Sequence, residues 1–145
     1  VIKYELFKYE KIYKRKFKYI LLLQPTTPIR NTNLLRKIIR IIKNNKNIDS
    51  VISVKDVGGN HPLRMKVFKK GLLKNYSGKK KEDMRPRQKL PKVFIRSGSF
   101  YLITRSSFIK YKSLVGKNCH GVILKGLEST NIDNILDLKY LEMKI

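Results

Sequence analysis

The sequence predicts an α/β domain built on a mostly parallel sheet, and three stretches carry that prediction. Residues 20–23 are a continuous apolar run that ends abruptly at Gln24 and Pro25. Residues 34–42 repeat Leu and Ile at helical spacing, and residues 49–54 form a second apolar segment. A strand without polar alternation is typical of a sheet covered by helices on both faces. We therefore expect a strand–helix–strand unit whose two strands are parallel.

The remaining elements follow from the same patterns. Residues 1–16 place apolar side chains at helical spacing between charges, which predicts an amphipathic helix. Residues 74–92 are rich in lysine and interrupted by Gly78, Pro86 and Pro91, which predicts a long excursion from the core. Further along, we expect a hairpin over 65–73, strands at 93–95, 99–103 and 122–124, and helices over 106–111 and 131–142.

Composition places the chain among globular proteins. Its 145 residues are 41% hydrophobic and 30% charged, which suffices for one domain with a core. The single Cys119 and the two histidines offer neither an internal disulfide nor a zinc cluster. No apolar run approaches the length of a membrane span, and we expect a cytoplasmic protein.

A formal charge of +24 raises the possibility of a nucleic-acid partner. Lysine and arginine are spread over nearly every segment together with many Ile and Asn, which indicates a bias of the whole composition. Aromatic residues alternate with lysines near the start of the chain: Tyr4, Phe7, Tyr9, Tyr13 and Phe17. No zinc-finger, RRM or KH signature accompanies them. A basic nucleic-acid-binding module therefore stays as an alternative function.

Polar side chains follow the first predicted strand, in a loop stiffened by two prolines. Open α/β sheets place their ligands at the carboxyl ends of strands, so this loop is a candidate binding site. Its polar side chains are Gln24, Thr26, Thr27 and Arg30. The alternative is an ordinary connection in which Asn31 or Thr32 caps the next helix.

Two further groups of residues could bind an anion or a cation. Arg64, and Arg87 with Gln88 between prolines, could recognise a carboxylate or phosphate through the planar guanidinium. Asp133 either caps the last helix or offers a carboxylate to Mg²⁺. His61 precedes Pro62, so we expect it to be a turn residue rather than a catalytic base.

Several segments, in this order, resemble motifs of the acylneuraminate cytidylyltransferases, the CMP-sialic acid synthetase family. They cover nearly the whole chain from Tyr19 onward. They are Gln24-Pro-Thr-Thr-Pro-Ile-Arg30, Asp49-Ser-Val-Ile-Ser-Val54, His61-Pro-Leu-Arg64, Arg87-Gln-Lys-Leu-Pro91, Gly98-Ser-Phe-Tyr101 and Ile132-Asp133 leading into Asp137.

The resemblance implies a Rossmann-like (GT-A-like) nucleotidyltransferase fold, a three-layer sandwich that forms a homodimer. It implies that CTP and a nine-carbon acidic sugar, a nonulosonic acid, react to give the CMP-sugar and pyrophosphate with Mg²⁺ as cofactor. Residues 74–92 would correspond to the dimerisation arm. The residues alone do not specify which nonulosonic acid is used.

The resemblance also implies roles for individual residues. Gln24, Thr26 and Thr27 would contact the sugar, and Phe100 and Tyr101 would form a wall of its pocket. Arg64, Arg87 and Gln88 would hold the sugar carboxylate, with Arg87 close to the reaction. Asp133 would hold the catalytic metal together with Asn131.

Three departures from the family pattern matter for the reaction. Asn131 stands where the family usually has Asp, and Ser97 stands where Asn is frequent. The glycine-rich loop that binds the CTP phosphates in the family does not occur in these 145 residues. We therefore expect residues 1–145 to be one partial domain, the sugar-binding part without its amino-terminal nucleotide-binding strands, inactive and poorly soluble by itself. A degenerate, non-catalytic relative is a further alternative.

Overall fold

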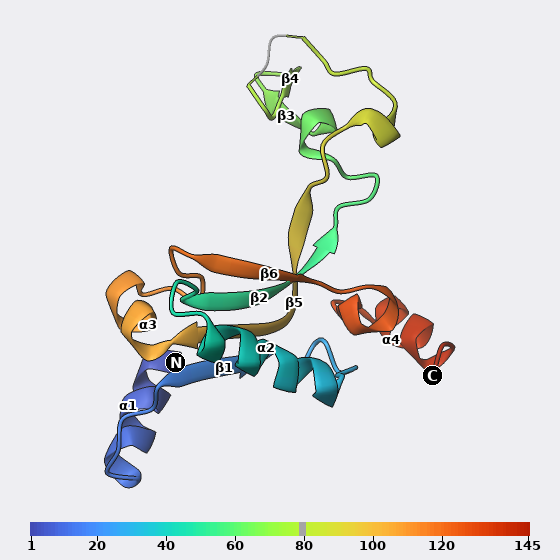
Figure 1. Ribbon diagram of the computed structural model, residues 1–145. Coiled ribbons are helices and arrows are strands. Elements are labelled where there is room, and N and C mark those ends of the chain that lie inside the picture. Colours follow the sequence, from blue (N-terminus) through green and yellow to red (C-terminus); the bar gives the residue numbers. More distant parts are fainter. Residues whose placement is uncertain (79–80) are drawn as a thin grey trace. The chain divides into compact units, whose positions relative to one another are not determined.

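The computed structural model describes residues 1–78 and 81–145, so Lys79 and Lys80 of the predicted excursion lie outside the described residues. The chain divides into two compact units (Figure 1). Unit 1 comprises residues 1–55 and 96–145, and unit 2 comprises residues 56–95. We describe each unit by itself.

Unit 1 contains most of the regular structure. Its helices are α1 (Ile2–Ile12), α2 (Thr32–Asn44), α3 (Arg105–Tyr111) and α4 (Ile135–Glu142). Its strands are β1 (Tyr19–Leu23), β2 (Ser50–Asp56), β5 (Phe94–Thr104) and β6 (Cys119–Ile123). The last residue of β2 and the first two residues of β5 belong to unit 2. Unit 2 contains the hairpin β3 (Lys66–Lys69) and β4 (Leu72–Asn75), with short 3₁₀ turns at Pro62–Arg64 and Arg87–Lys89.

The four-stranded sheet has the order β1-β5-β2-β6. β1 and β5 are antiparallel, with Leu22 opposite Tyr101, and β2 and β6 are parallel. The Thr104 amide donates to the Asp49 carbonyl, and Ser53 Oγ bonds the backbone of Phe100, so β5 and β2 are also antiparallel. The mixed α/β class is therefore confirmed, whereas the prediction of a mostly parallel sheet is wrong. The apolar pattern did not reveal that β5 lies between β1 and β2.

β1 is an edge strand rather than a central one. Its only neighbour in the sheet order is β5, and Leu21 keeps 37% of its surface exposed. The prediction that residues 20–23 are buried on both faces is therefore wrong for Leu21. An all-apolar run favours a strand, but it does not determine where that strand lies in the sheet.

Two clusters of buried side chains cover the two faces of the sheet. Between α2 and the sheet lie Ile38, Ile42, Val51, Phe100, Leu102 and Leu124. The second cluster joins Leu6 of α1 and Phe108 of α3 to Ile103 of β5. Because Leu102 and Ile103 are consecutive in a strand, their side chains point to opposite faces. Helices therefore pack on both faces of this sheet.

The helix caps decide two of the alternatives left by the sequence. Asn31 caps α2, because its Oδ1 accepts from the amides of Asn33 and Leu34 at 3.0 and 3.1 Å. α4 is capped by Asn134, and Asp137 completes a capping box. Asp133 is therefore not the cap of the last helix, which begins four residues later than predicted. No helix among the described residues has the length and apolar character needed to cross a membrane.

Candidate functional site

Three segments that are distant in sequence meet in unit 1 near the end of β1. The loop after β1 folds back through a hydrogen bond from the Thr27 amide to the Gln24 carbonyl, at 3.2 Å. The Ile132 amide donates to the Thr26 carbonyl at 2.8 Å, which attaches residues 131–133 to this loop. Gly98 of β5 lies against the side chain of Gln24. We call these three segments the β1-end cluster.

The Arg30 side chain stabilises the loop through a hydrogen bond to its backbone. Its Nη2 donates to the Gln24 carbonyl at 2.7 Å. The same carbonyl also accepts from the Thr27 amide, so two residues of the loop bind back to its first residue. Thr27 is also structural in character, because it is fully buried and its hydroxyl lies 3.5 Å from Asn131 Oδ1. Thr26 is exposed and Gln24 is half-buried. Of the predicted sugar contacts in this loop, these two offer surface to a ligand.

Asn131 and Asp133 are in direct contact. Asn131 Nδ2 donates to Asp133 Oδ1 at 2.6 Å, and Asp133 is exposed. Among the described residues, no group of three or more His, Cys, Asp and Glu side chains could hold a metal. An exposed carboxylate is a ligand that Mg²⁺ takes together with phosphates and water. The part of the Asn131 amide that faces Asp133 is its N–H₂ group, so the amide would have to turn before its oxygen could share a cation with Asp133. A magnesium role for this pair therefore stays a prediction.

The two predicted aromatic residues have different surroundings. Phe100 is 1% exposed and belongs to the cluster under α2, so it offers almost no surface to a ligand. Tyr101 is 9% exposed and its side chain points to the opposite face of the sheet. Contact of either ring with a sugar stays a prediction, and the burial of Phe100 favours a supporting role.

Ser97 of β5 stands where the family frequently has Asn, a departure that the resemblance connects with the choice of sugar. It is 4% exposed, and its Oγ is a buried side-chain atom without a hydrogen-bond partner in the described part of the chain. Buried hydroxyls are normally paired, so an unpaired one next to Gly98 is unusual. The sequence marks Ser97 by its place just before the Gly98 motif and by its departure from Asn, but neither signal indicates that its hydroxyl is buried and unpaired.

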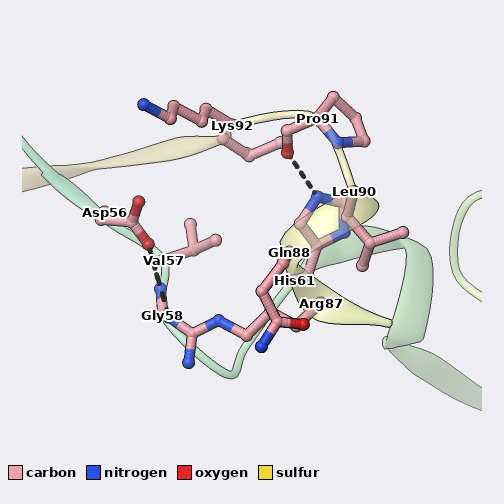
Figure 2. A pocket seen from close by; sticks show the side chains of 10 residues that line it. Asp56, Val57, Gly58, His61, Arg87, Gln88, Leu90, Pro91 and Lys92 are labelled. Carbon is pink, nitrogen blue, oxygen red and sulfur yellow. Dashed lines mark hydrogen bonds and ion pairs between the residues drawn. The ribbon is translucent and has the colours of Figure 1, made fainter. Parts of the chain in front are cut away.

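Unit 2 contains a hollow of about 330 Å³ (Figure 2). Its lining combines a carboxylate and cations with apolar walls: Asp56, Val57, Gly58, His61, Arg87, Gln88, Leu90, Pro91, Lys92 and Val93. The predicted residues Arg87 and Gln88 therefore lie together at a cavity. Asp56, Gly58 and Lys92 were missed, because nothing in the local sequence distinguishes them from loop residues.

The His61 side chain forms hydrogen bonds to two segments that line or adjoin the hollow. The Leu63 amide donates to His61 Nδ1 at 3.2 Å, so Nδ1 is an acceptor and Nε2 carries the proton. Nε2 then donates to the Pro91 carbonyl at 3.0 Å, as Figure 2 shows. With its side chain buried, His61 links the turn after it to the segment that carries Arg87. It starts a 3₁₀ turn, as the sequence predicts.

Arg87 and Arg64 are held in different ways. Arg87 Nη2 lies 3.9 Å from Asp56 Oδ1, and both side chains are more than half exposed, so this ion pair is weak. Asp56 Oδ1 also accepts from the Gly58 amide at 2.7 Å. Arg64 donates to the Arg85 carbonyl at 3.0 Å and is not part of the lining. Arg87 is therefore the better placed of the two for an anion in this hollow.

No family model matches this chain, and no curated protein matches it.

Proposed function

We propose that this chain is the sugar-binding part of a cytidylyltransferase that activates a nonulosonic acid with CTP. One observation carries the proposal. Segments 24–27, 98 and 131–133 were singled out separately by their resemblance to one family, and they meet in the β1-end cluster. The contact of Gln24 with Gly98 follows from the pairing of β1 with β5, so the independent support is the hydrogen bond that attaches residues 131–133 to the loop.

The proposal includes a Rossmann-like nucleotidyltransferase fold with three layers. Support comes from the helices on both faces of the sheet in unit 1. Open α/β sheets bind ligands beyond the carboxyl ends of their strands, and the β1-end cluster begins where β1 ends. The antiparallel β5 departs from a purely parallel sheet but leaves that end of β1 in place.

The proposed reaction forms one bond and breaks one bond. The anomeric hydroxyl oxygen of the sugar attacks the α-phosphorus of CTP, and the bond from that phosphorus to the bridging oxygen breaks. Pyrophosphate leaves, and the hydroxyl proton passes to water or a base. Mg²⁺ bound to Asp133 and Asn131 would offset the charge on the phosphates.

The side chains of this chain would bind and orient the sugar. Gln24 and Thr26 would hydrogen-bond its hydroxyl or amide groups, because both present polar atoms at the β1-end cluster. Within unit 2, the hollow offers a carboxylate the guanidinium of Arg87 and the side-chain amide of Gln88. Lys92 lines the same hollow and would add a second positive charge.

The experiment is a calorimetric titration of the chain with N-acetylneuraminate, legionaminate and pseudaminate. We expect saturable binding of at least one of them and its loss in Arg87→Ala. Lys89→Ala is the matched control, because it removes one charge from the same 3₁₀ turn without touching the hollow. Absence of binding to all three sugars, or equal losses in both variants, would contradict the proposal.

A second candidate function is weak binding of single-stranded nucleic acid by α1 and the residues just after it. Lys3 lies over the ring of Phe7 at 5.8 Å, and Arg15 lies over the ring of Tyr13 at 5.8 Å. Both rings are exposed, and exposed rings beside cations are the groups on which bases stack. This candidate predicts that the affinity for nucleic acid falls steeply as the salt concentration rises. Binding of the sugar through Arg87 should instead be abolished by the single substitution Arg87→Ala.

A further inference from the structure

We infer that Gly98 is a positioning residue for Gln24. Because glycine has no side chain, the space beside Gly98 is free for the Gln24 carboxamide. The inference rests on the proposed function, in which Gln24 contacts the sugar. It extends that function by assigning the orientation of the contact to a residue of another strand.

The evidence is a close approach between the two residues. A Cβ atom on Gly98 would lie 2.5 Å from Gln24 Oε1 and 3.8 Å from its Cδ. The first distance is shorter than non-bonded atoms tolerate, so any side chain at position 98 must displace the carboxamide. The next neighbour, Thr27 Oγ1, would lie at 3.9 Å, which is ordinary contact. The clash therefore involves the end of one side chain.

The backbone of Gln24 is fixed independently. Its carbonyl accepts from the Thr27 amide at 3.2 Å and from Arg30 Nη2 at 2.7 Å. The main chain of Gln24 is thus fixed, and its carboxamide lies against the backbone of Gly98 in β5. A polar group that is already oriented loses less freedom when a ligand binds. Filling the place above Gly98 should therefore weaken ligand binding while the loop itself stays folded.

Backbone strain needs a separate control, because Gly98 has a φ of +83°. Gly71 has a φ of +79°, and in the described part of the chain nothing lies within 4 Å of where its Cβ would be. Gly71→Ala thus imposes the same kind of strain without touching a neighbour. A difference between the two alanine variants reports the contact with Gln24.

The experiment measures N-acetylneuraminate affinity and the side-chain amide NMR signals of Gln24 in wild type, Gly98→Ala, Gly71→Ala, Gln24→Ala and the Gly98→Ala/Gln24→Ala double variant. We expect Gly98→Ala to lose roughly three- to tenfold in affinity, about the value of one hydrogen bond. Its Gln24 amide signals should move, and Gly71→Ala should match wild type in both measurements. The double variant should bind as Gln24→Ala does, because Gly98 acts through Gln24.

Each other outcome overturns a distinct claim. If wild type does not bind the sugar, the proposed function fails, and this inference fails with it. If wild type binds and Gly98→Ala binds equally well, or the two single effects multiply, only the inference fails. If Gly98→Ala does not fold, the double variant is tested for a cooperative melting transition. Removal of the Gln24 side chain must then restore folding, and a double variant that also fails to fold would overturn the inference.

Discussion

The guanidinium of Arg105 in α3 forms a bidentate ion pair with the carboxylate of Glu10 in α1, with two hydrogen bonds. Nε lies 2.6 Å from Oε1 and Nη2 lies 2.9 Å from Oε2. The Phe17 amide also donates to Glu10 Oε1, at 3.1 Å. One carboxylate therefore joins α1, α3 and the segment that leads into β1.

This arrangement predicts a pH-dependent stability. The hydrogen bonds from Arg105 lower the pKa of Glu10 below its ordinary value. A carboxyl group whose pKa is lower in the folded state contributes stability above its unfolded pKa, and this contribution is lost as the pH falls through the folded pKa. We expect Glu10→Gln to lower the melting temperature at neutral pH, and the difference from wild type to shrink under acidic conditions below the usual glutamate range.

Melting curves of both proteins between acidic and neutral pH check this prediction. Glu5→Gln is the matched control, since it removes the same charge from the same helix without removing the contact with Arg105. A loss in Glu5→Gln as large as that in Glu10→Gln would assign the effect to net charge.

The sequence predicted where helices and strands occur better than how the strands pair. Helical periodicity located α2, and a continuous apolar run located β1, because each pattern lies within one segment of the chain. It did not reveal that β5 lies between β1 and β2, because pairing depends on contacts between segments far apart in the sequence. The cap of α4 was misplaced by one residue, since Asp133 and Asn134 are both good caps.

The candidate site was predictable only in part, for the same reason. The resemblance selected Gln24, Arg87 and Asp133 because each lies in a recognisable local motif. Asp56 and Lys92 line the hollow because two loops that are distant in the sequence lie close together in space. No local sequence pattern predicts which loops come together.

The loop before β6 is organised around Asp49. Its Oδ2 accepts from the Lys117 amide at 2.9 Å, and its Oδ1 accepts from the Asn118 amide at 3.1 Å. A Cβ on Gly116 would collide with this carboxylate, which those hydrogen bonds hold in place. We expect Gly116→Ala to cost about 2 kcal/mol in the free energy of unfolding.

Denaturant unfolding of Gly116→Ala measures that cost. Gly121→Ala in β6 is the control, because its Cβ would make only ordinary contact with Val54, at 3.6 Å. Equal stability of the two variants would mean that the Asp49 carboxylate moves aside at little cost.

The tautomer of His61 provides a test of unit 2. The hydrogen bonds to Leu63 and Pro91 require a proton on Nε2 and none on Nδ1. Nitrogen NMR of the neutral imidazole should therefore show Nε2 protonated, and His61→Ala should lose about 1–3 kcal/mol, because buried partners are left unpaired. His120→Ala is the control, because His120 is exposed. A mixture of tautomers would contradict this description of the hollow.

The resemblance implies a homodimer formed by an arm over residues 74–92, and we propose that the β3–β4 hairpin, which leads into that arm, is also covered in the dimer. Phe68 and Leu73 are opposite each other in the hairpin and are 75% and 59% exposed. We expect a dimer by light scattering, and a monomer when both residues are changed to Ser. Changing the exposed Lys70 to Ser, at the turn, should leave the dimer intact. A monomeric wild type would remove the dimerisation arm from the proposal.

Asn131 provides a test of the proposed magnesium role that does not depend on turnover. Asn131→Asp would replace the amide that donates to Asp133 at 2.6 Å with a second carboxylate. Without Mg²⁺ the two like charges repel each other, so we expect a lower melting temperature than in wild type. Saturating Mg²⁺ should restore the loss, because a cation between two carboxylates offsets their charge.

Asn134→Asp adds the same charge at the cap of α4, where Asp is also a good cap, and it should gain no stability from Mg²⁺. If Mg²⁺ stabilises both variants equally, the effect is general screening by salt rather than binding. If Asn131→Asp is stable without Mg²⁺ and unchanged with it, Asp133 and position 131 do not share a cation. The metal role proposed for them would then have to be abandoned.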